Sequence, residues 1–311
     1  MIIINFLFFQ PSCKYQRSEI RFMSFNSKLV LNGLNIFLLL ILILPFQTYG
    51  NTQTKQTDSM VSVGNHSLHM VTMGHGEDTV IIEAGYMGEL ADWRAFATSI
   101  ATFSKVVIYS RAGYGKSTPS PTPNSLNDSV EELKMLTKIS ELEGPFIMVG
   151  HSYGGLIVRK FSEMYPDHVK GLVFVEPASE NYFKTLREID PSSTEASRKK
   201  MYGRLSGNKL EEYKLMMTNY YDTPIDIIEL ASLPDVPAVV LTAAKKRNSK
   251  SLANTPKARK AWREEHSKLI KKFPQSSHIV TTNSGHFIQL DEPELIADAI
   301  KNVINQANYK Q

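Results

Sequence analysis

The sequence predicts an α/β fold with a mostly parallel, eight-stranded sheet that is flanked by helices and carries a helical cap insertion. Short β-rich runs alternate with helical patterns along most of residues 60–311, and this alternation is typical of parallel sheets. Most of the strand-like runs are continuously apolar, as expected for strands that are buried on both faces. Between about residues 178 and 233 the pattern changes to polar, aromatic and Met-rich helical segments, which predicts the cap.

Six strands are predicted from continuous apolar runs rich in β-branched residues. They cover residues 79–83, 105–109, 146–149, 171–175, 238–241 and 278–281. Two weaker segments near residues 60–63 and 68–73 alternate in polarity and predict an antiparallel start to the sheet. Helical patterns lie at residues 93–101, 129–142, 153–165, 257–273 and 293–305.

The N-terminal residues 1–50 are typical of a targeting segment. Residues 29–46 read LVLNGLNIFLLLILILPF without a charge, and Lys28 stands directly before them. This pattern predicts a signal peptide, and hence a periplasmic or secreted protein, or alternatively an uncleaved membrane anchor. A start at Met23 instead of Met1 would give a signal peptide of ordinary length. A polar linker is predicted at residues 51–59.

The composition excludes several classes of protein. The chain has 311 residues, of which 42% are apolar and 21% charged, as in ordinary globular proteins. Residues 51–311 hold 31 basic and 30 acidic side chains, so no nucleic-acid partner is expected. Cys13 is the only cysteine, which rules out an internal disulfide framework. No sequence motif indicates a metal site or a cofactor.

A candidate nucleophile lies where an apolar strand meets a helical pattern. Residues 146–155 read FIMVGHSYGG and contain the motif G-x-S-x-G around Ser152. The motif makes a sharp turn between a strand and a helix, where Gly150 and Gly154 avoid collisions with the neighbouring backbone. The helix start behind Ser152 also favours negative charge on a reacting oxygen.

His286 is the candidate general base that a serine nucleophile requires. It lies in NSGHFIQLDEPE, after the last predicted strand and before the last predicted helix. The catalytic order serine, acid, histidine is the one expected on this kind of sheet. The small neighbours Ser284 and Gly285 would let the imidazole approach Ser152.

A candidate oxyanion hole lies in the loop after the strand at residues 79–83, within the run IIEAGYMGE. Gly85 would permit a tight turn there. The backbone N–H of Tyr86 is expected to act together with that of Tyr153, the residue after the candidate nucleophile. The side chains of Tyr86 and Met87 would then line an acyl pocket.

Glu176 is the predicted acid of the triad. The segment after residues 238–241 reads TAAKKRNSKSLANT and has no carboxylate until Glu264. Glu176 instead follows the apolar run GLVFV directly, so it would lie at the carboxyl end of its strand. Asp235 is the main alternative, although it precedes its strand and would lie at the opposite edge of the sheet.

Taken together, EAGYMGE, YSRAGYGKS, VGHSYGG, LVFVEPASE and NSGHFIQLDEPE resemble the α/β-hydrolase superfamily, in its cap-bearing serine hydrolase and esterase branch. The resemblance implies the α/β-hydrolase fold. Ser110 departs from it, because relatives commonly carry aspartate there. The neighbouring Arg111 is expected to make a structural ion pair, and the missing acid after Leu241 favours Glu176.

Hydrolysis of a carboxylic ester through an acyl-Ser152 intermediate is the predicted activity, as in esterases and lipase-like enzymes. The substrate would be a small ester-like molecule with an apolar acyl group, roofed by aromatic and Met residues of the cap. These are Tyr202, Tyr213, Met216, Met217, Tyr220 and Tyr221. Amide, thioester or C–C bond hydrolysis stays open, as does a ligand-binding protein without catalysis. Membrane contact is expected only through residues 29–46.

Overall fold

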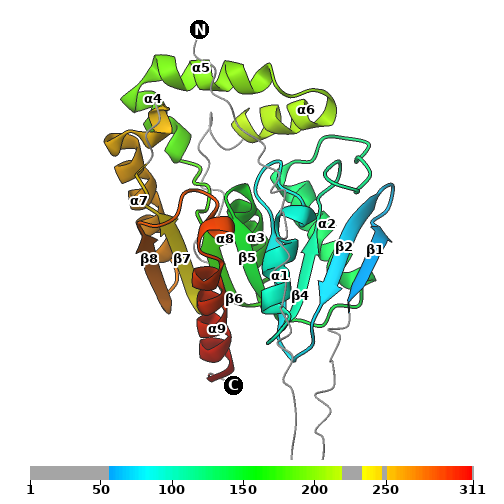
Figure 1. Cartoon of the computed structure of the whole chain (residues 1–311). Coiled ribbons are helices and arrows are strands. Elements are labelled where there is room, and N and C mark those ends of the chain that lie inside the picture. Colours follow the sequence, from blue (N-terminus) through cyan, green and yellow to red (C-terminus); the bar gives the residue numbers. More distant parts are fainter. Residues whose placement is uncertain (1–55, 219–232, 247–250, 310–311) are drawn as a thin grey trace, which may run out of the picture. The chain divides into compact units, whose positions relative to one another are not determined.

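The computed structural model describes residues 56–218, 233–246 and 251–309. An eight-stranded sheet forms their centre, with the strand order β1-β2-β4-β3-β5-β6-β7-β8 (Figure 1). The strands are β1 (Thr57–Ser62), β2 (Ser67–Met73), β3 (Thr79–Glu83), β4 (Lys105–Tyr109), β5 (Phe146–His151), β6 (Val169–Val175), β7 (Ala238–Ala243) and β8 (Ser276–Thr281). The pairs β1–β2 and β2–β4 are antiparallel and the other five pairs are parallel, which confirms the predicted fold class.

The helices follow the strands in alternation, as their patterns predict. Those that alternate with the strands are α1 (Arg94–Ile100), α2 (Leu126–Ile139), α3 (Tyr153–Met164), α7 (Pro256–Ile270) and α9 (Pro293–Tyr309). Short helical turns lie at η1 (Leu90–Asp92), η2 (Pro166–His168), η5 (Leu252–Asn254) and α8 (Ile288–Asp291). Thr255 caps α7 by accepting a hydrogen bond from the N–H of Ala258, and Pro256 occupies the first helical position.

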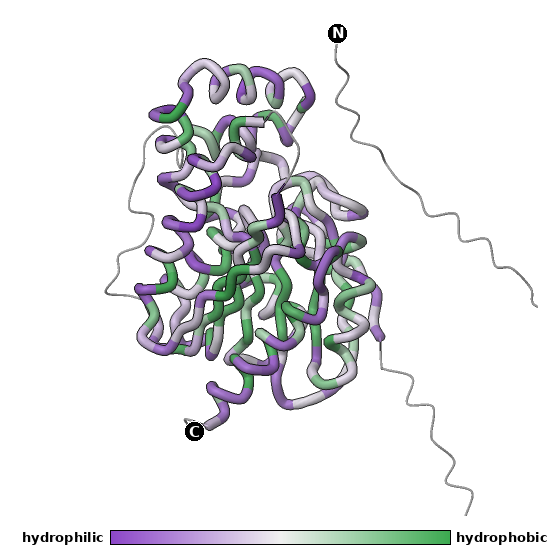
Figure 2. The backbone as a smooth tube through the Cα atoms, turned by 60° about the vertical axis from the view of Figure 1, so that its left-hand side comes forward, coloured by the Kyte–Doolittle hydropathy of each residue, from purple (hydrophilic) through white to green (hydrophobic). Residues whose placement is uncertain are grey.

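Both faces of the sheet are covered by helices, because successive side chains of each strand point to opposite sides. Met148 of β5 and Phe174 of β6 pack with residues of α2, α3 and α7. Their neighbours Val149 and Val175 pack with residues of α1 and α9 on the other face. Figure 2 shows the hydrophobic residues concentrated along the strands. The core thus fixes the carboxyl ends of the parallel strands, where the candidate residues lie.

The segment between β6 and β7 is helical in its described part. It contains α4 (Tyr182–Ile189), α5 (Pro191–Tyr202) and α6 (Gly207–Met216), and no strand occurs in residues 178–218. Residues 219–232 of the predicted cap, including Tyr220 and Tyr221, lie outside the described residues. Tyr213, Met216 and Met217 are buried in the same hydrophobic cluster as Tyr153.

Of the predicted N-terminal segments, the structure describes only the end of the linker, from residue 56 onward. β1 begins at Thr57, inside the predicted linker at residues 51–59, because its backbone pairs with β2 from Thr57 onward. Within the described ranges, no helix combines the length and the apolar character that crossing a bilayer requires. The predicted signal peptide or anchor at residues 1–50 lies outside the described residues.

Candidate active site

Ser152 occupies a strained turn between β5 and α3. Its backbone has φ 51° and ψ −118°, a conformation that non-glycine residues rarely adopt. The turn is held by the Ser152 N–H, which donates to Val175 O at 3.1 Å, and by Ser152 O, which accepts from Ala178 N at 2.8 Å. A side chain at Gly154 would overlap the backbone carbonyl of Glu83. This is the turn that G-x-S-x-G predicts, with a half-buried serine at its apex.

His286 and Glu176 meet at the carboxyl edge of the sheet. Glu176 follows β6, His286 follows β8, and Glu176 Oε2 lies 3.3 Å from His286 Nδ1. The Glu176 side chain is 6% exposed, whereas that of His286 is 35% exposed. A carboxylate only accepts hydrogen bonds, so Nδ1 carries the proton when His286 is neutral. Its Nε2 is then left with a free lone pair.

Several donors keep Glu176 ionised. Burial alone would raise the pKa of this carboxyl, but His286, His266 and the N–H of Ala243 together lower the pKa below its ordinary value. Ala243 N donates to Oε1 at 2.6 Å, and Trp262 Nε1 donates to Oε2 at 3.2 Å. Glu176 itself has φ 48°, in the left-handed region. Asp235 instead accepts from Gln275 before the start of β7.

His151 connects the serine turn to His286. The two imidazole rings lie 4.8 Å apart, and His151 Nε2 lies 2.9 Å from His286 O. Because a carbonyl oxygen can only accept, His151 Nε2 carries its proton. Burial and the neighbouring His286 lower the pKa of His151 to about 3, so it is neutral at physiological pH. Among the described residues no hydrogen bond joins Ser152 Oγ to His286, and such bonds are often long without substrate.

The loop after β3 approaches Ser152 closely. An added Cβ at Gly85 would lie 3.0 Å from His151 Nδ1 and 3.2 Å from Ser152 Cβ. The predicted turn is present, with Gly88 N donating to Gly85 O at 3.0 Å, and the close approach to His151 and Ser152 also favours glycine at this position. The following Tyr86 packs edge-on against Tyr153, with ring centroids 6.3 Å apart. The two residues whose N–H groups are predicted to form an oxyanion hole thus lie side by side.

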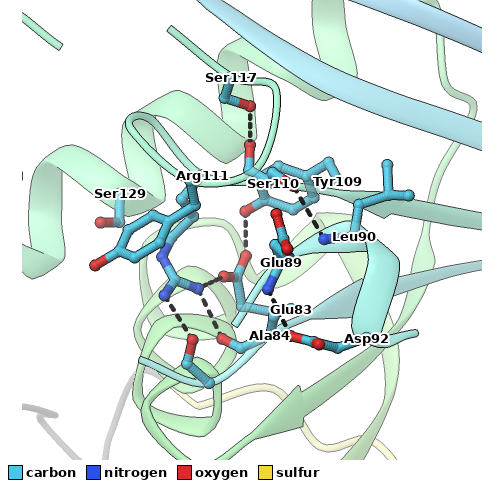
Figure 3. Close-up of polar contacts among 12 residues, drawn as sticks. Glu83, Ala84, Glu89, Leu90, Asp92, Tyr109, Ser110, Arg111, Ser117 and Ser129 are labelled. Carbon is cyan, nitrogen blue, oxygen red and sulfur yellow. Dashed lines mark hydrogen bonds and ion pairs between the residues drawn. The ribbon is translucent and has the colours of Figure 1, made fainter. Parts of the chain in front are cut away.

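Arg111 holds this loop through its backbone carbonyls (Figure 3). Its guanidinium donates to Glu83 Oε1 at 2.5 Å and to the carbonyls of Ala84 and Gly85 at 2.7 Å. Glu83 also accepts from the hydroxyl of Tyr109, and all these groups are buried. Burial opposes the charge of Arg111, but the Glu83 carboxylate raises the pKa of Arg111 above its ordinary value. The predicted ion pair of Arg111 is therefore present, with Glu83 as its partner.

A polar cavity of about 500 Å³ lies between α6 and the loop after β4, and includes Lys209 and Glu212 in its lining. Neither Ser152 nor His286 belongs to this lining. Tyr114, in the loop after β4, donates its hydroxyl hydrogen to Glu212 Oε2 at 2.7 Å. Tyr86 likewise donates to Lys209 O at 2.7 Å. The loop next to Ser152 is therefore tied to α6 by its own side chains.

Comparison with known proteins agrees with this fold. Residues 78–197 match the family model described as alpha/beta hydrolase fold. The chain has the α/β-hydrolase fold. It is 25% identical over 228 residues to the uncharacterized protein YqjL of Bacillus subtilis (strain 168), covering 72% of this chain and 83% of YqjL.

Two further proteins show how far the likeness extends. The AB hydrolase superfamily protein of Gibberella zeae is 32% identical over 121 residues, which are 38% of this chain and 37% of that protein. A thermophilic esterase from Thermogutta terrifontis superposes with a TM-score of 0.57 at 18% identity, covering 81% of this chain and 99% of the esterase. This structural likeness supports the fold.

The sequence did not predict part of the surroundings of this candidate site. His151, Trp262 and His266 were not identified as neighbours of the candidate triad residues, nor was Glu83 identified as the partner of Arg111. His151 could have been found from its place between Gly150 and Ser152. Trp262 and His266 lie in α7, where nothing in the helical pattern distinguishes a buried polar contact from core packing.

Proposed function

We propose that this α/β hydrolase is a serine esterase that works through an acyl-Ser152 intermediate. Ser152 Oγ would attack the ester carbonyl while His286 Nε2 takes its proton, and the N–H groups of Tyr86 and Tyr153 would stabilise the oxyanion. His286 would return the proton to the leaving alcohol, and water would then release the acid by the reverse steps. Glu176 would orient His286 and stabilise its imidazolium form.

The observation that carries this proposal is the pairing of Glu176 Oε2 with His286 Nδ1 at 3.3 Å beside the strained turn of Ser152. The pairing leaves His286 Nε2 as the acceptor, which is the protonation state a general base needs. A non-catalytic binding protein would have no need for an oriented histidine next to a strained serine. The esterase from Thermogutta terrifontis has the same fold, which adds support.

An apolar acyl group fits the surface around His286. Phe287 is 45% exposed, and its ring lies 5.4 Å from that of His286 and 5.7 Å from that of His151. Leu290 of α8 and Met87 of the loop after β3 are also exposed. Burying one methylene contributes about 0.8 kcal/mol, so we expect KM to fall roughly fourfold per added acyl methylene until the surface is filled.

The test is turnover of p-nitrophenyl esters of graded acyl length by the full chain, beside Ser152→Ala. We expect burst kinetics in the parent and a loss of at least about 10³-fold in kcat in Ser152→Ala. Ser140→Ala, at the end of α2, is the matched control and should keep the parent rate. Labelling with a fluorophosphonate tests the nucleophile independently of the substrate.

The outcomes separate the alternatives. Fluorophosphonate labelling at Ser152 without ester turnover would move amide, thioester or C–C bond hydrolysis ahead. A folded protein that neither turns over esters nor reacts at Ser152 would overturn the serine hydrolase proposal and leave a binding function.

We also propose that residues 29–46 direct export of the enzyme. The proposal rests on the uncharged apolar run behind Lys28. Mass spectrometry of the native N-terminus after cell fractionation tests it. A mature N-terminus near residue 51 in a periplasmic or secreted fraction is expected, whereas an intact run in the membrane fraction would indicate an anchor instead.

A further inference from the structure

One face of α7 is turned toward the ends of β6 and β7. Arg259, Trp262 and His266 are spaced by three and four residues, so their side chains lie on the same side of the helix. Each of the three makes a polar contact with the backbone or side chain around Glu176.

Trp262 contacts the same carboxylate oxygen as the histidine base. Its Nε1–H donates to Glu176 Oε2 at 3.2 Å, and His286 Nδ1 lies 3.3 Å from that oxygen. The indole is itself held between the rings of Tyr182 at 4.5 Å and His266 at 4.7 Å. The position of Oε2 is thus set by a rigid donor as well as by the partner that it orients.

The other carboxylate oxygen is held through Ala243. Its N–H donates to Glu176 Oε1 at 2.6 Å, and its carbonyl accepts from Arg259 Nη2 at 2.7 Å. The end of β7, where the sequence offers no acid, therefore supplies a backbone donor to the acid at the end of β6. Arg259 of α7 fixes the orientation of that strand end.

His266 fixes the backbone that follows Glu176. Its Nε2 lies 2.8 Å from Pro177 O, and since a carbonyl only accepts, Nε2 carries the proton. Burial lowers the pKa of His266 to about 4, so the ring is neutral and its Nδ1 accepts from Thr242 Oγ1 at 2.6 Å. Thr242 in turn accepts from His278 Nε2 at 2.7 Å. The chain of hydrogen bonds has a single direction, toward Pro177.

The contacts from α7 stabilise Glu176 in a backbone conformation that is itself unfavourable. Glu176 has φ 48°, and a non-glycine residue in this region costs on the order of 1 to 3 kcal/mol. Such a conformation persists only when its surroundings fix it from several sides. We propose that Trp262 and His266 of α7 are positioning residues, which hold Glu176 in this conformation and keep its Oε2 on His286 Nδ1. The inference rests on the proposed function of the triad.

The decisive experiment is a double-mutant cycle with the full chain and a p-nitrophenyl ester. Trp262→Phe keeps the ring between Tyr182 and His266 but removes the N–H donor. We expect kcat to fall about tenfold with unchanged KM, and the far-UV circular dichroism spectrum, which reports on the backbone, should not change. In the Glu176→Gln background the same change should have less than about a twofold effect, because Trp262 acts through the carboxylate.

A second pair of variants tests His266. His266→Gln keeps an N–H that can reach Pro177 O and should retain most of the parent kcat, whereas His266→Leu should lose about tenfold. Lys260→Gln is the matched control on α7, because the Lys260 side chain is 72% exposed and points away from the site. It should leave both constants unchanged.

The outcomes distinguish this inference from the proposed function. If Trp262→Phe lowers kcat by the same factor in the parent and in the Glu176→Gln background, Trp262 has a purely structural role and the inference is overturned. An unchanged kcat in Trp262→Phe, together with a large loss in Glu176→Gln, would overturn it while leaving the triad intact. If Glu176→Gln itself keeps the parent rate, the triad assignment is wrong and the inference falls with it.

Discussion

Glu83 and Glu176 are two buried glutamates at the carboxyl ends of strands in the same sheet, and their ion-pair partners differ. Glu83, at the end of β3, pairs with Arg111, which is 3% exposed and charged at any ordinary pH. Glu176, after β6, pairs with His286, which is 35% exposed and can take up or release a proton. The first pair holds a loop in place. The second can take part in proton transfer, because its partner can change charge.

The hydrogen-bond donors around the two carboxylates also differ. Arg111 also donates through Nη1 and Nη2 to the carbonyls of Ala84 and Gly85, so it holds backbone that approaches Ser152 (Figure 3). Around Glu176, the donors of Ala243 and Trp262 converge on the carboxylate itself. A buried acid is therefore structural or catalytic according to its partner, and burial alone does not tell the two apart.

The largest expected effect is on catalysis at the Glu176 pair. Glu176→Gln should lower kcat by roughly 10³ to 10⁴-fold, since an amide can no longer stabilise the imidazolium of His286. The free energy of unfolding should fall by only about 1 to 3 kcal/mol, because the amide accepts through one atom and leaves one of the buried donors Ala243 N–H and Trp262 Nε1–H unpaired. Steady-state kinetics and calorimetry of the same sample measure both quantities. A large loss of stability with a small loss of kcat would reverse the roles assigned to the two acids.

The second effect concerns stability at the Glu83 pair. Glu83→Gln leaves the buried charge of Arg111 without its counter-ion, so the free energy of unfolding should fall by about 3 to 5 kcal/mol. Urea unfolding at neutral pH gives this value. Glu163→Gln, in a partly exposed ion pair with Lys160 on α3, is the control and should cost less than about 1 kcal/mol. Equal losses for both variants would contradict a special role of the buried pair.

A third effect separates the two regions by pH. Burial lowers the pKa of His266 from 6.5 to about 4, so the unfolded chain binds this proton more readily than the folded one. Stability should therefore decline as pH falls from about 6.5 toward 4, with a contribution from His266 on the order of 3 kcal/mol at pH 4.

The variant His266→Gln should flatten this decline, and urea unfolding at several pH values measures the slope. Arg111 does not titrate in this range, so the Glu83 region contributes no comparable term from its cation. An unchanged slope in His266→Gln would show that His266 is not held neutral in the folded protein.

The smallest effect is expected where the two regions meet. Gly85→Ala would place a Cβ 3.2 Å from that of Ser152, so the loop held by Arg111 must shift by a few tenths of an ångström. We expect about a tenfold loss of kcat with little change in the free energy of unfolding. Gly203→Ala is the control for stability, because Gly203 has φ −71° and its added Cβ would meet only ordinary contacts at 3.6 and 3.8 Å. A parent-like kcat in Gly85→Ala would argue against an oxyanion hole in this loop.

Much of the fold could be predicted because it depends on local patterns. Continuous apolar runs mark the strands of a sheet that helices cover on both faces, and the two alternating runs mark the antiparallel edge. The structure extends β5 by His151 and β7 by Ala243, beyond the ends that the apolar runs predict. It also starts β1 at Thr57, where polar residues pair through their backbone without any apolar signal.

The residues of the candidate site also fall into those that local patterns predict and those that depend on tertiary contacts. Ser152 carries a local motif, His286 follows the last strand, and Glu176 ends an apolar run when no acid follows the next strand, so the sequence by itself determined these three positions. Only the tertiary structure decided that Glu83 and Arg111 pair, and that Trp262 and His266 face Glu176. These contacts join residues that lie far apart along the chain, and their geometry depends on how α7 and the loop after β3 pack against the sheet. A residue-by-residue pattern carries no such information, because a helix face looks the same whether it buries apolar groups or donates hydrogen bonds.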